Sequence, residues 1–213
     1  MPETIAIETT NPRAGVAVVR DGAVVFLQHF TSERSHNSQL FGPLGEALKL
    51  CQDLRAIVVG TGPGSYTGAR IGIAAAQGIA LSRRVPVIGL PSVLAPETPG
   101  APSDFTVCGD ARRGQFFIAR VSKGLLKDGI TLHDGPDFTR LYSQRSALPW
   151  FCFDNKPPLD LEGITLSSPS ASRLALLAAA LTDETIWTLE QQALEPHYLA
   201  APFVTKAKER LIG

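Results

Sequence analysis

The amino-acid sequence predicts an α/β protein made of two related subdomains, the second smaller and less regular than the first. In the first half, short apolar runs of strand length alternate with longer amphipathic stretches, as in a sheet with crossover helices. In the second half, the chain restarts with a strand, an acidic turn and another strand. With 213 residues, 44% of them hydrophobic, the chain is large enough to bury a substantial core.

The elements of the first half follow a definite order. Strands are expected at 4–7, 15–19, 23–29, 55–60 and 85–90, and helices at 35–51 and 68–83. Asp21-Gly22 is a strong hairpin signal between the second and third strands. Pro43 is expected to kink the first helix or delay its start. Three strands followed by helix, strand, helix and strand is the order of a ribonuclease-H-like unit.

Prolines mark the expected boundary between the halves. Residues 1–95 are expected to form the N-terminal subdomain, 96–103 a proline-rich connection, and 104–213 the C-terminal subdomain. The second half repeats the opening of the first, with strands at 105–109 and 115–121 around the turn 110–114. Two facing halves of this kind describe the actin-like ATPase superfamily.

The rest of the second half gives fewer signals. Ser168 followed by Pro169 predicts the N-cap and first position of a helix that continues to Leu181. Residues 140–162 are expected to be irregular.

Composition excludes several classes of protein. Lys plus Arg and Asp plus Glu number 20 each, so the net charge is zero, unlike that of a dedicated nucleic-acid binder. Cys51, Cys108 and Cys152 are widely separated in the sequence and odd in number, so we expect neither a disulfide framework nor a metal knuckle. The chain opens without a basic region and contains no apolar run of bilayer length, so we expect a cytoplasmic protein with no membrane contact.

A glycine-rich stretch, residues 60–70, lies between a predicted strand and a predicted helix. Glycines and a helix N-terminus at such a place can bind phosphate. The spacing matches neither a P-loop nor the dinucleotide fingerprint, because no Lys follows Gly68 and Thr67 stands where the third glycine belongs. The alternative is a tight connection capped by Ser65 or Thr67.

The helix after this stretch carries two adjacent stripes. The small-residue stripe, with one member every four positions, consists of Gly68, Gly72, Ala76 and Ala80. The apolar stripe beside it consists of Ile71, Ala75 and Ile79. One face must pack on the helix's own sheet. Because the helix has almost no charge from Ile71 to Ser82, we expect a second face to be covered by another polypeptide.

These motifs together resemble the TsaB (YeaZ) family. The most specific is Gly62-Pro63-Gly64-Ser65-Tyr66-Thr67-Gly68-Ala69-Arg70-Ile71-Gly72. Shorter matches occur at residues 5–10, 35–36, 75–80, 86–89, 110–115 and 196–199. Ala200 departs from the pattern, which usually has an Arg there, and residues 122–190 match weakly.

The family is a shortened relative of TsaD, the subunit that transfers a threonylcarbamoyl group to the tRNA adenosine beside the anticodon. The positions of TsaD's two metal-binding histidines fall on Ser92 and Pro96, and neither side chain can replace an imidazole. The resemblance therefore implies a partner subunit with no catalytic residues, no metal and no cofactor of its own.

The resemblance also implies the partners. The two helices at 35–51 and 68–83 would pack against a TsaD-type subunit, or against a second copy of this chain when that subunit is absent. The expected interface residues are Leu40, Leu44, Arg70, Ile71, Gly72, Ala75, Ala76 and Ile79. A TsaE-type ATPase and tRNA would join through the assembly, which uses ATP and magnesium.

The alternative is an actin-like small-molecule kinase or ATPase. Glu8 and Asp110 would then face each other across a cleft and hold magnesium, although carboxylates after strands are also common turn residues. The candidate nucleotide-binding residues are Glu8, Thr9, Gly62, Gly64, Ser65, Asp110, Arg112 and Arg113. Arg112 and Arg113 fit either phosphate binding or a solvated hairpin tip.

Overall fold

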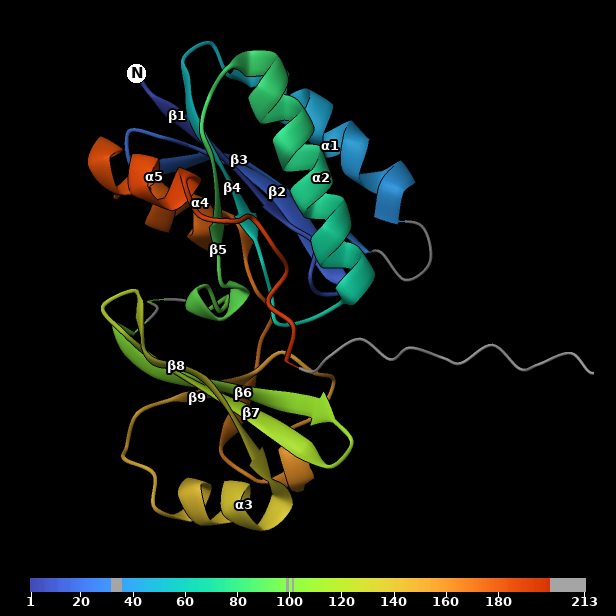
Figure 1. Ribbon diagram of the computed structural model, residues 1–213, viewed down its shortest axis with the longest axis vertical. Coiled ribbons are helices and arrows are strands. Elements are labelled where there is room, and N and C mark those ends of the chain that lie inside the picture. The colour runs from blue at the N-terminus through green and yellow to red at the C-terminus, as the bar shows by residue number, and fades with distance from the viewer. Residues whose placement is uncertain (32–35, 99, 101, 200–213) are drawn as a thin grey trace, which may run out of the picture.

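A computed structural model describes residues 1–31, 36–98, 100 and 102–199, and it contains two five-stranded sheets, one above the other in Figure 1. Ser35, where the first helix was expected to begin, and Ala200 lie outside the described residues. No helix of the described part is both long and apolar enough to cross a membrane.

The first sheet has the ribonuclease-H-like order that the sequence predicted. Its strands are β1 Glu3–Glu8, β2 Arg13–Arg20, β3 Ala23–Thr31, β4 Leu54–Gly60 and β5 Val87–Leu90, arranged β3-β2-β1-β4-β5. β1 is antiparallel to β2 and parallel to β4. Asp21 and Gly22 both have positive φ angles, 51° and 74°, so the expected hairpin turn is confirmed.

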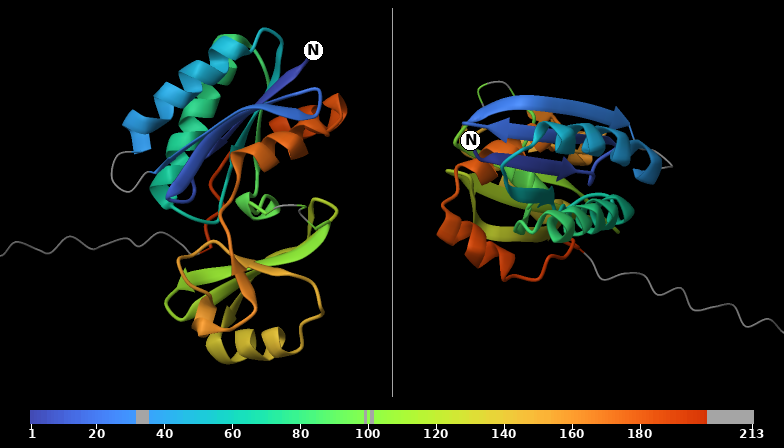
Figure 2. Two further views of the ribbon diagram at one scale, coloured as in Figure 1. Left: turned by 180° about the vertical axis from the view of Figure 1, so that it is seen from behind. Right: turned by 90° about the horizontal axis from the view of Figure 1, so that it is seen from above.

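Helices cover both faces of this sheet. α1 (His36–Leu50) and α2 (Tyr66–Arg83) lie on one face, and α4 (Ala171–Ala179) and α5 (Asp183–Glu190) lie on the other (Figures 1 and 2). Pro43 is the eighth residue of α1, so the expected delay of the helix start is wrong. Because proline has no N–H, the helix lacks the backbone hydrogen bond that residue 43 would otherwise donate to the Gln39 carbonyl.

The second sheet repeats the first in a shorter form. Its strands are β6 Asp104–Arg112, β7 Gln115–Ser122, β8 Leu125–Asp134, β9 Trp150–Cys152 and β10 Ile164–Leu166. Their order is β10-β9-β6-β7-β8, so each strand takes the same relative place as its counterpart in the first sheet. β9 and β10 have only three residues each, in line with the predicted smaller and less regular half.

Two predictions for this half were wrong. Residues 140–162 are not wholly irregular, because they contain the end of α3 (Gly135–Ser143), all of β9 and the short 3-10 helix η2 (Pro158–Asp160). The N-cap of α4 is Ser170, whose hydroxyl accepts a hydrogen bond from the Arg173 N–H, not Ser168. Ser168 and Pro169 instead pair with the Pro96–Glu97 segment in extended conformation.

The last two helices lie far in sequence from the sheet they cover. α4 packs against β1 and β2, and α5 packs near β5, so part of the segment expected as the second subdomain completes the first sheet. The stretch around η1 (Ser92–Leu94) leads from β5 of the first sheet to β6 of the second.

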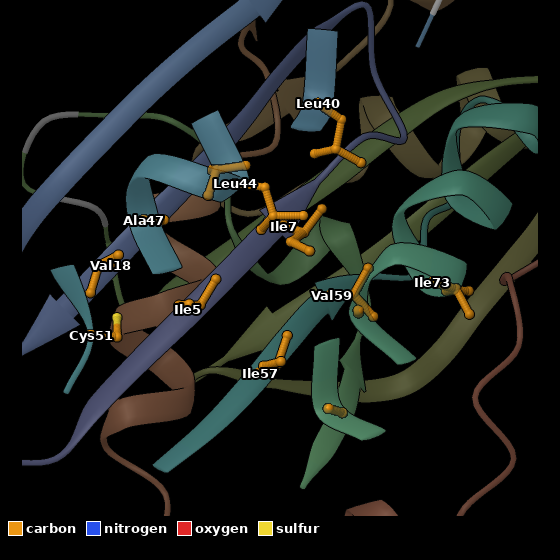
Figure 3. Packing of buried hydrophobic residues seen from close by; sticks show 13 residues of the cluster. Ile5, Ile7, Val18, Leu40, Leu44, Ala47, Cys51, Ile57, Val59 and Ile73 are labelled. Carbon is orange, nitrogen blue, oxygen red and sulfur yellow. The ribbon is translucent and has the colours of Figure 1, made fainter. Parts of the chain in front are cut away.

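The larger part of the first core lies between the sheet and the helices α1 and α2. Leu40 and Leu44 of α1 point toward β1 and meet Ile5 and Ile7, while Ile73 of α2 meets β4 (Figure 3). Leu40 is completely buried. This packing fixes the rotation of α1, and therefore determines which of its side chains face solvent.

Replacing Leu40 with Ala should lower the free energy of unfolding by about 2–5 kcal/mol, because a buried methyl-rich side chain is replaced by a cavity. Urea denaturation would measure this. The control is Leu81→Ala on α2, where the side chain is 84% exposed and the expected change is below about 0.5 kcal/mol. Equal effects at the two positions would contradict the assigned rotation of α1.

Candidate functional site

The glycine-rich loop joins β4 to α2 and begins that helix with a cap. Ser65 is the N-cap, and its hydroxyl accepts a hydrogen bond from the Gly68 N–H at 3.1 Å. Thr67 lies inside the first turn and is not the cap. From the sequence alone, either Ser65 or Thr67 could have been the N-cap.

The loop packs tightly against the turn that follows β1. A Cβ atom at Gly64 would lie 2.2 Å from the Thr10 carbonyl oxygen, and one at Gly68 would lie 1.9 Å from the Thr9 carbonyl oxygen. The Ser65 N–H donates to the Thr10 carbonyl at 2.6 Å, and the Thr9 hydroxyl donates to the Gly68 carbonyl at 2.7 Å. Glycine is thus required here for contact between two parts of the same chain.

Glu8 lies at the end of β1 and is completely buried. One carboxylate oxygen accepts hydrogen bonds from the Thr10 N–H (2.7 Å) and the Thr10 hydroxyl (2.6 Å). The other oxygen is 2.7 Å from the Ser92 hydroxyl, whose oxygen also accepts from the Gly62 N–H at 3.0 Å. Burial raises the pKa of Glu8 above its ordinary value, although these hydrogen bonds oppose the rise.

The residues at the TsaD metal positions do not fit a metal. Ser92 is committed to the hydrogen bonds with Glu8 and Gly62, and Pro96 forms a bridge with Pro169. Within residues 1–31, 36–98, 100 and 102–199, no three or more His, Cys, Asp and Glu side chains are grouped closely enough to hold a metal ion.

The magnesium pair that the kinase alternative requires, Glu8 and Asp110, is not formed in this structure. Glu8 has no exposed surface, so its carboxylate cannot face a cleft. Asp110 is exposed and accepts a hydrogen bond from the Arg112 N–H at 2.7 Å within its own turn. Arg112 and Arg113 have φ angles of 72° and 56° and lie exposed at the tip of the hairpin between β6 and β7.

A groove on the outer surface of α2 is open to solvent. Its volume is about 780 Å³, and its lining includes Phe41, Tyr66, Arg70, Ile71, Ala75 and Ile79. Phe41 is 61% exposed and Tyr66 is 45% exposed. The groove therefore presents aromatic and aliphatic side chains to solvent beside one arginine, which is the composition of a protein-binding surface.

The structure divides the expected interface residues into two groups. Arg70, Ile71, Ala75 and Ile79 lie along the groove. The remaining four face the chain's own core: Leu40, Leu44, Gly72 and Ala76. At Gly72 a Cβ atom would lie 2.3 Å from the Thr9 hydroxyl oxygen, so the small-residue stripe lets α2 approach its own sheet and is not an exposed surface.

Two aromatic residues at the edge of the groove were missed as site residues. Tyr66 stacks on Tyr198 with 4.9 Å between ring centroids, and Arg70 donates a hydrogen bond to the Tyr66 hydroxyl oxygen at 2.7 Å. The chain near Tyr198 is fixed by a hydrogen bond from the His197 N–H to the Thr61 carbonyl at 2.7 Å. Both tyrosines belong to motifs quoted from the sequence, but nothing in the sequence indicates that they meet.

Gly68→Ala should lower the free energy of unfolding by at least about 2 kcal/mol, because the new Cβ would overlap the Thr9 carbonyl and force α2 away from the sheet. Gly78→Ala in the same helix is the matched control. No atom lies within 4 Å of a Cβ at Gly78, so this change should be neutral or stabilising by up to about 1 kcal/mol. Chemical denaturation of both variants would test the assignment, and a tolerated Gly68→Ala would refute it.

Glu8 should make stability depend on pH. Between the ordinary pKa of 4.5 and the raised pKa, the folded chain keeps a proton that the unfolded chain loses. The free energy of unfolding should therefore fall as pH rises through this window, by up to about 1.4 kcal/mol per pH unit, and then level off. Glu8→Gln does not titrate and should lack this part of the fall.

Urea unfolding of the wild type and of Glu8→Gln over a series of pH values would measure the effect. Other titrating groups are the same in both proteins and cancel in the difference between the two curves. A difference that does not change with pH would show that Glu8 titrates normally in the folded chain.

Comparisons with known proteins agree with this geometry. Residues 31–136 match the family model described as TsaD, tRNA N6-adenosine threonylcarbamoyltransferase. The tRNA threonylcarbamoyladenosine biosynthesis protein TsaB of Bacillus subtilis is 33% identical over 134 residues, which cover 59% of this chain and 58% of that protein. TsaB of Escherichia coli is 36% identical over 95 residues, which cover 42% of this chain and 40% of that protein.

The match therefore spans only about half the length of these curated relatives. Among solved structures, YeaZ from Pseudomonas aeruginosa superposes with a TM-score of 0.66 at 21% identity, covering 93% of this chain and 100% of that one. This likeness supports the two-subdomain fold. In sequence and in fold, the chain is therefore similar to the TsaB (YeaZ) proteins.

Proposed function

We propose that the chain is a non-catalytic partner subunit of a TsaD-type tRNA threonylcarbamoyl transferase, and that it is required for threonylcarbamoyladenosine modification of tRNA. The observation that carries this proposal is the solvent-exposed groove on α2, with Phe41, Tyr66 and Ile71 on a helix pair whose other face is already packed. The curated relatives are named for the same biosynthesis.

The buried residues support a binding role over a catalytic one. Glu8 and Ser92 bond to each other, and the glycine loop bonds to the Thr9-Thr10 turn, so these groups are engaged within the chain. Of the groups that the kinase alternative would use, Glu8 and the glycine loop are thus occupied by the fold itself.

The groove also suggests how the assembly is organised. A TsaD-type subunit would lay a similar pair of helices on α2 and cover Phe41, Ile71 and Ala75. A second copy of this chain would use the same surface in the absence of that subunit, so the two complexes would exclude each other. A TsaE-type ATPase and tRNA would then join the TsaD-bound form.

Ala74→Arg should weaken binding to the TsaD-type subunit of the same organism by at least about tenfold, because a charged side chain would enter the groove. Ala74 is exposed and lines the groove, so the folded chain can accommodate the change. Titration calorimetry with the purified partner would give the affinity, and size exclusion with light scattering would show whether self-association weakens too.

The matched control is Leu166→Arg on β10, a half-exposed leucine of the second sheet that takes no part in the groove. It adds the same charge and should leave the affinity unchanged. If Ala74→Arg binds as tightly as the wild type, or if the wild type does not bind the TsaD-type subunit, the proposal fails.

A further inference from the structure

A second cavity lies in the smaller half, on the face of the second sheet that α3 covers. Its volume is about 370 Å³, and its lining includes Thr106, Arg120, Lys127, Arg145, Leu148 and Trp150. None of these residues belongs to the groove on α2 or to the Glu8 cluster.

The cavity lies beside the C-terminal end of α3. Under the helix, Cys108 of β6 and Ile118 of β7 are paired in the sheet and pack with Phe138 of α3. Two positions further along the same strands and on the same face, the paired residues are Thr106 and Arg120. The face thus changes from apolar to polar near the end of the nine-residue helix, and the cavity is lined there by the sheet and by the segment that follows α3.

Thr106 is a buried polar residue that lines this cavity. It pairs with Arg120 on one side and with Trp150 on the other, and only 5% of its surface is exposed. Thr106 lines the cavity, and its side chain makes no hydrogen bond to another described residue. Its hydroxyl oxygen is not among the described polar atoms that are both buried and unpaired, so solvent reaches it and a ligand can replace that solvent.

Three cationic side chains line the cavity, those of Arg120, Lys127 and Arg145, against one carboxylate, that of Asp104. The Arg145 guanidinium lies 3.7 Å from the centre of the Tyr142 ring and donates to the Tyr142 carbonyl at 2.9 Å, which fixes its orientation. Lys127 has no carboxylate within 4 Å among the described residues, and the Asp128 carboxylate is 3.9 Å from Arg120. In a chain of zero net charge, this is a local excess of positive charge.

We propose that this cavity binds a phosphate-bearing ligand of nucleotide size, either a free nucleotide or a nucleotide within an RNA strand. Phosphate oxygens accept hydrogen bonds from arginine guanidinium groups and from lysine ammonium groups, and the Thr106 hydroxyl adds a further donor. Trp150 and Leu148 supply an apolar wall for the sugar or base, and the volume lies in the lower range for small-ligand sites. The inference does not depend on the proposed partner role.

The two tryptophans allow a direct test on the isolated full-length chain. Trp150 lines the cavity, whereas Trp187 lies 63% exposed on α5. In ¹H–¹⁵N spectra, titration with AMP should shift the indole signal of Trp150 and leave that of Trp187 unchanged, with Trp187→Phe used for assignment. A parallel titration uses a short single-stranded oligoribonucleotide.

Two variants test the donors. Lys127→Gln combined with Arg145→Gln should weaken binding by at least about tenfold, and Thr106→Val, nearly equal in shape, by about threefold to tenfold. Arg83→Gln combined with Arg84→Gln removes the same charge from exposed positions at the end of α2 and should have no effect. Unchanged spectra elsewhere would show that each variant remains folded.

The outcomes separate the sources of the phosphate. Tighter binding of AMP than of the oligoribonucleotide, with the Trp150 shift, identifies a free nucleotide, and the reverse order identifies an RNA strand. The proposal is overturned if neither probe moves the Trp150 signal, or if the control variant weakens binding as much as the cavity variant. Loss of TsaD binding in the separate experiment would leave this result untouched.

Discussion

The structure depends most on the burial of the Glu8 carboxylate. Its oxygens connect the end of β1 to the following turn through Thr10 and to the end of β5 through Ser92. Ser92 in turn holds the glycine loop through the Gly62 N–H. A carboxylate removed from water is costly unless its hydrogen bonds are satisfied, so this cluster requires three segments of the chain to stay in one arrangement.

This arrangement also sets the position of the groove. The turn after β1 fits into the spaces left by Gly64 and Gly68, which brings α2 against the sheet and places the half-buried Ile71 and Ala75 along the groove. The packing that buries Glu8 and the glycine loop thus also positions the outer surface of α2. The contact between this turn and the two glycines therefore determines both which face of α2 is buried and which face is exposed.

Signals contained in neighbouring residues were read correctly from the sequence. The Asp21-Gly22 turn needs only its own backbone angles, and the element order of the first half needs only apolar runs and periodicity. The three-residue strands β9 and β10 could not be predicted in this way, because their conformation is imposed by pairing with β6 and with each other. The start of α4 was misplaced by two residues, since Ser168 and Ser170 are equally good caps in sequence.

The site was predicted only in part, and the reason is distance along the chain. Whether Glu8 faces a cleft or the core is decided by Ser92, 84 residues away. The stripe Gly72 and Ala76 looked like a partner surface, but the Thr9 side chain and β4 occupy the space beside it. The composition of a small-residue stripe does not distinguish packing against the chain's own sheet from packing against a partner protein.

The position of α4 has a consequence for synthesis of the chain. The strands of the first sheet are all complete by Leu90, yet the helix that covers the inner face of β1 and β2 begins only at Ala171. The ribosome synthesises all strands of the second sheet before this helix. During that time Ala17 and Val19 lack the apolar side chains that cover them in the folded chain. The amino-terminal half is therefore not a self-sufficient unit, and a fragment that ends between the two sheets would be an aggregation-prone product.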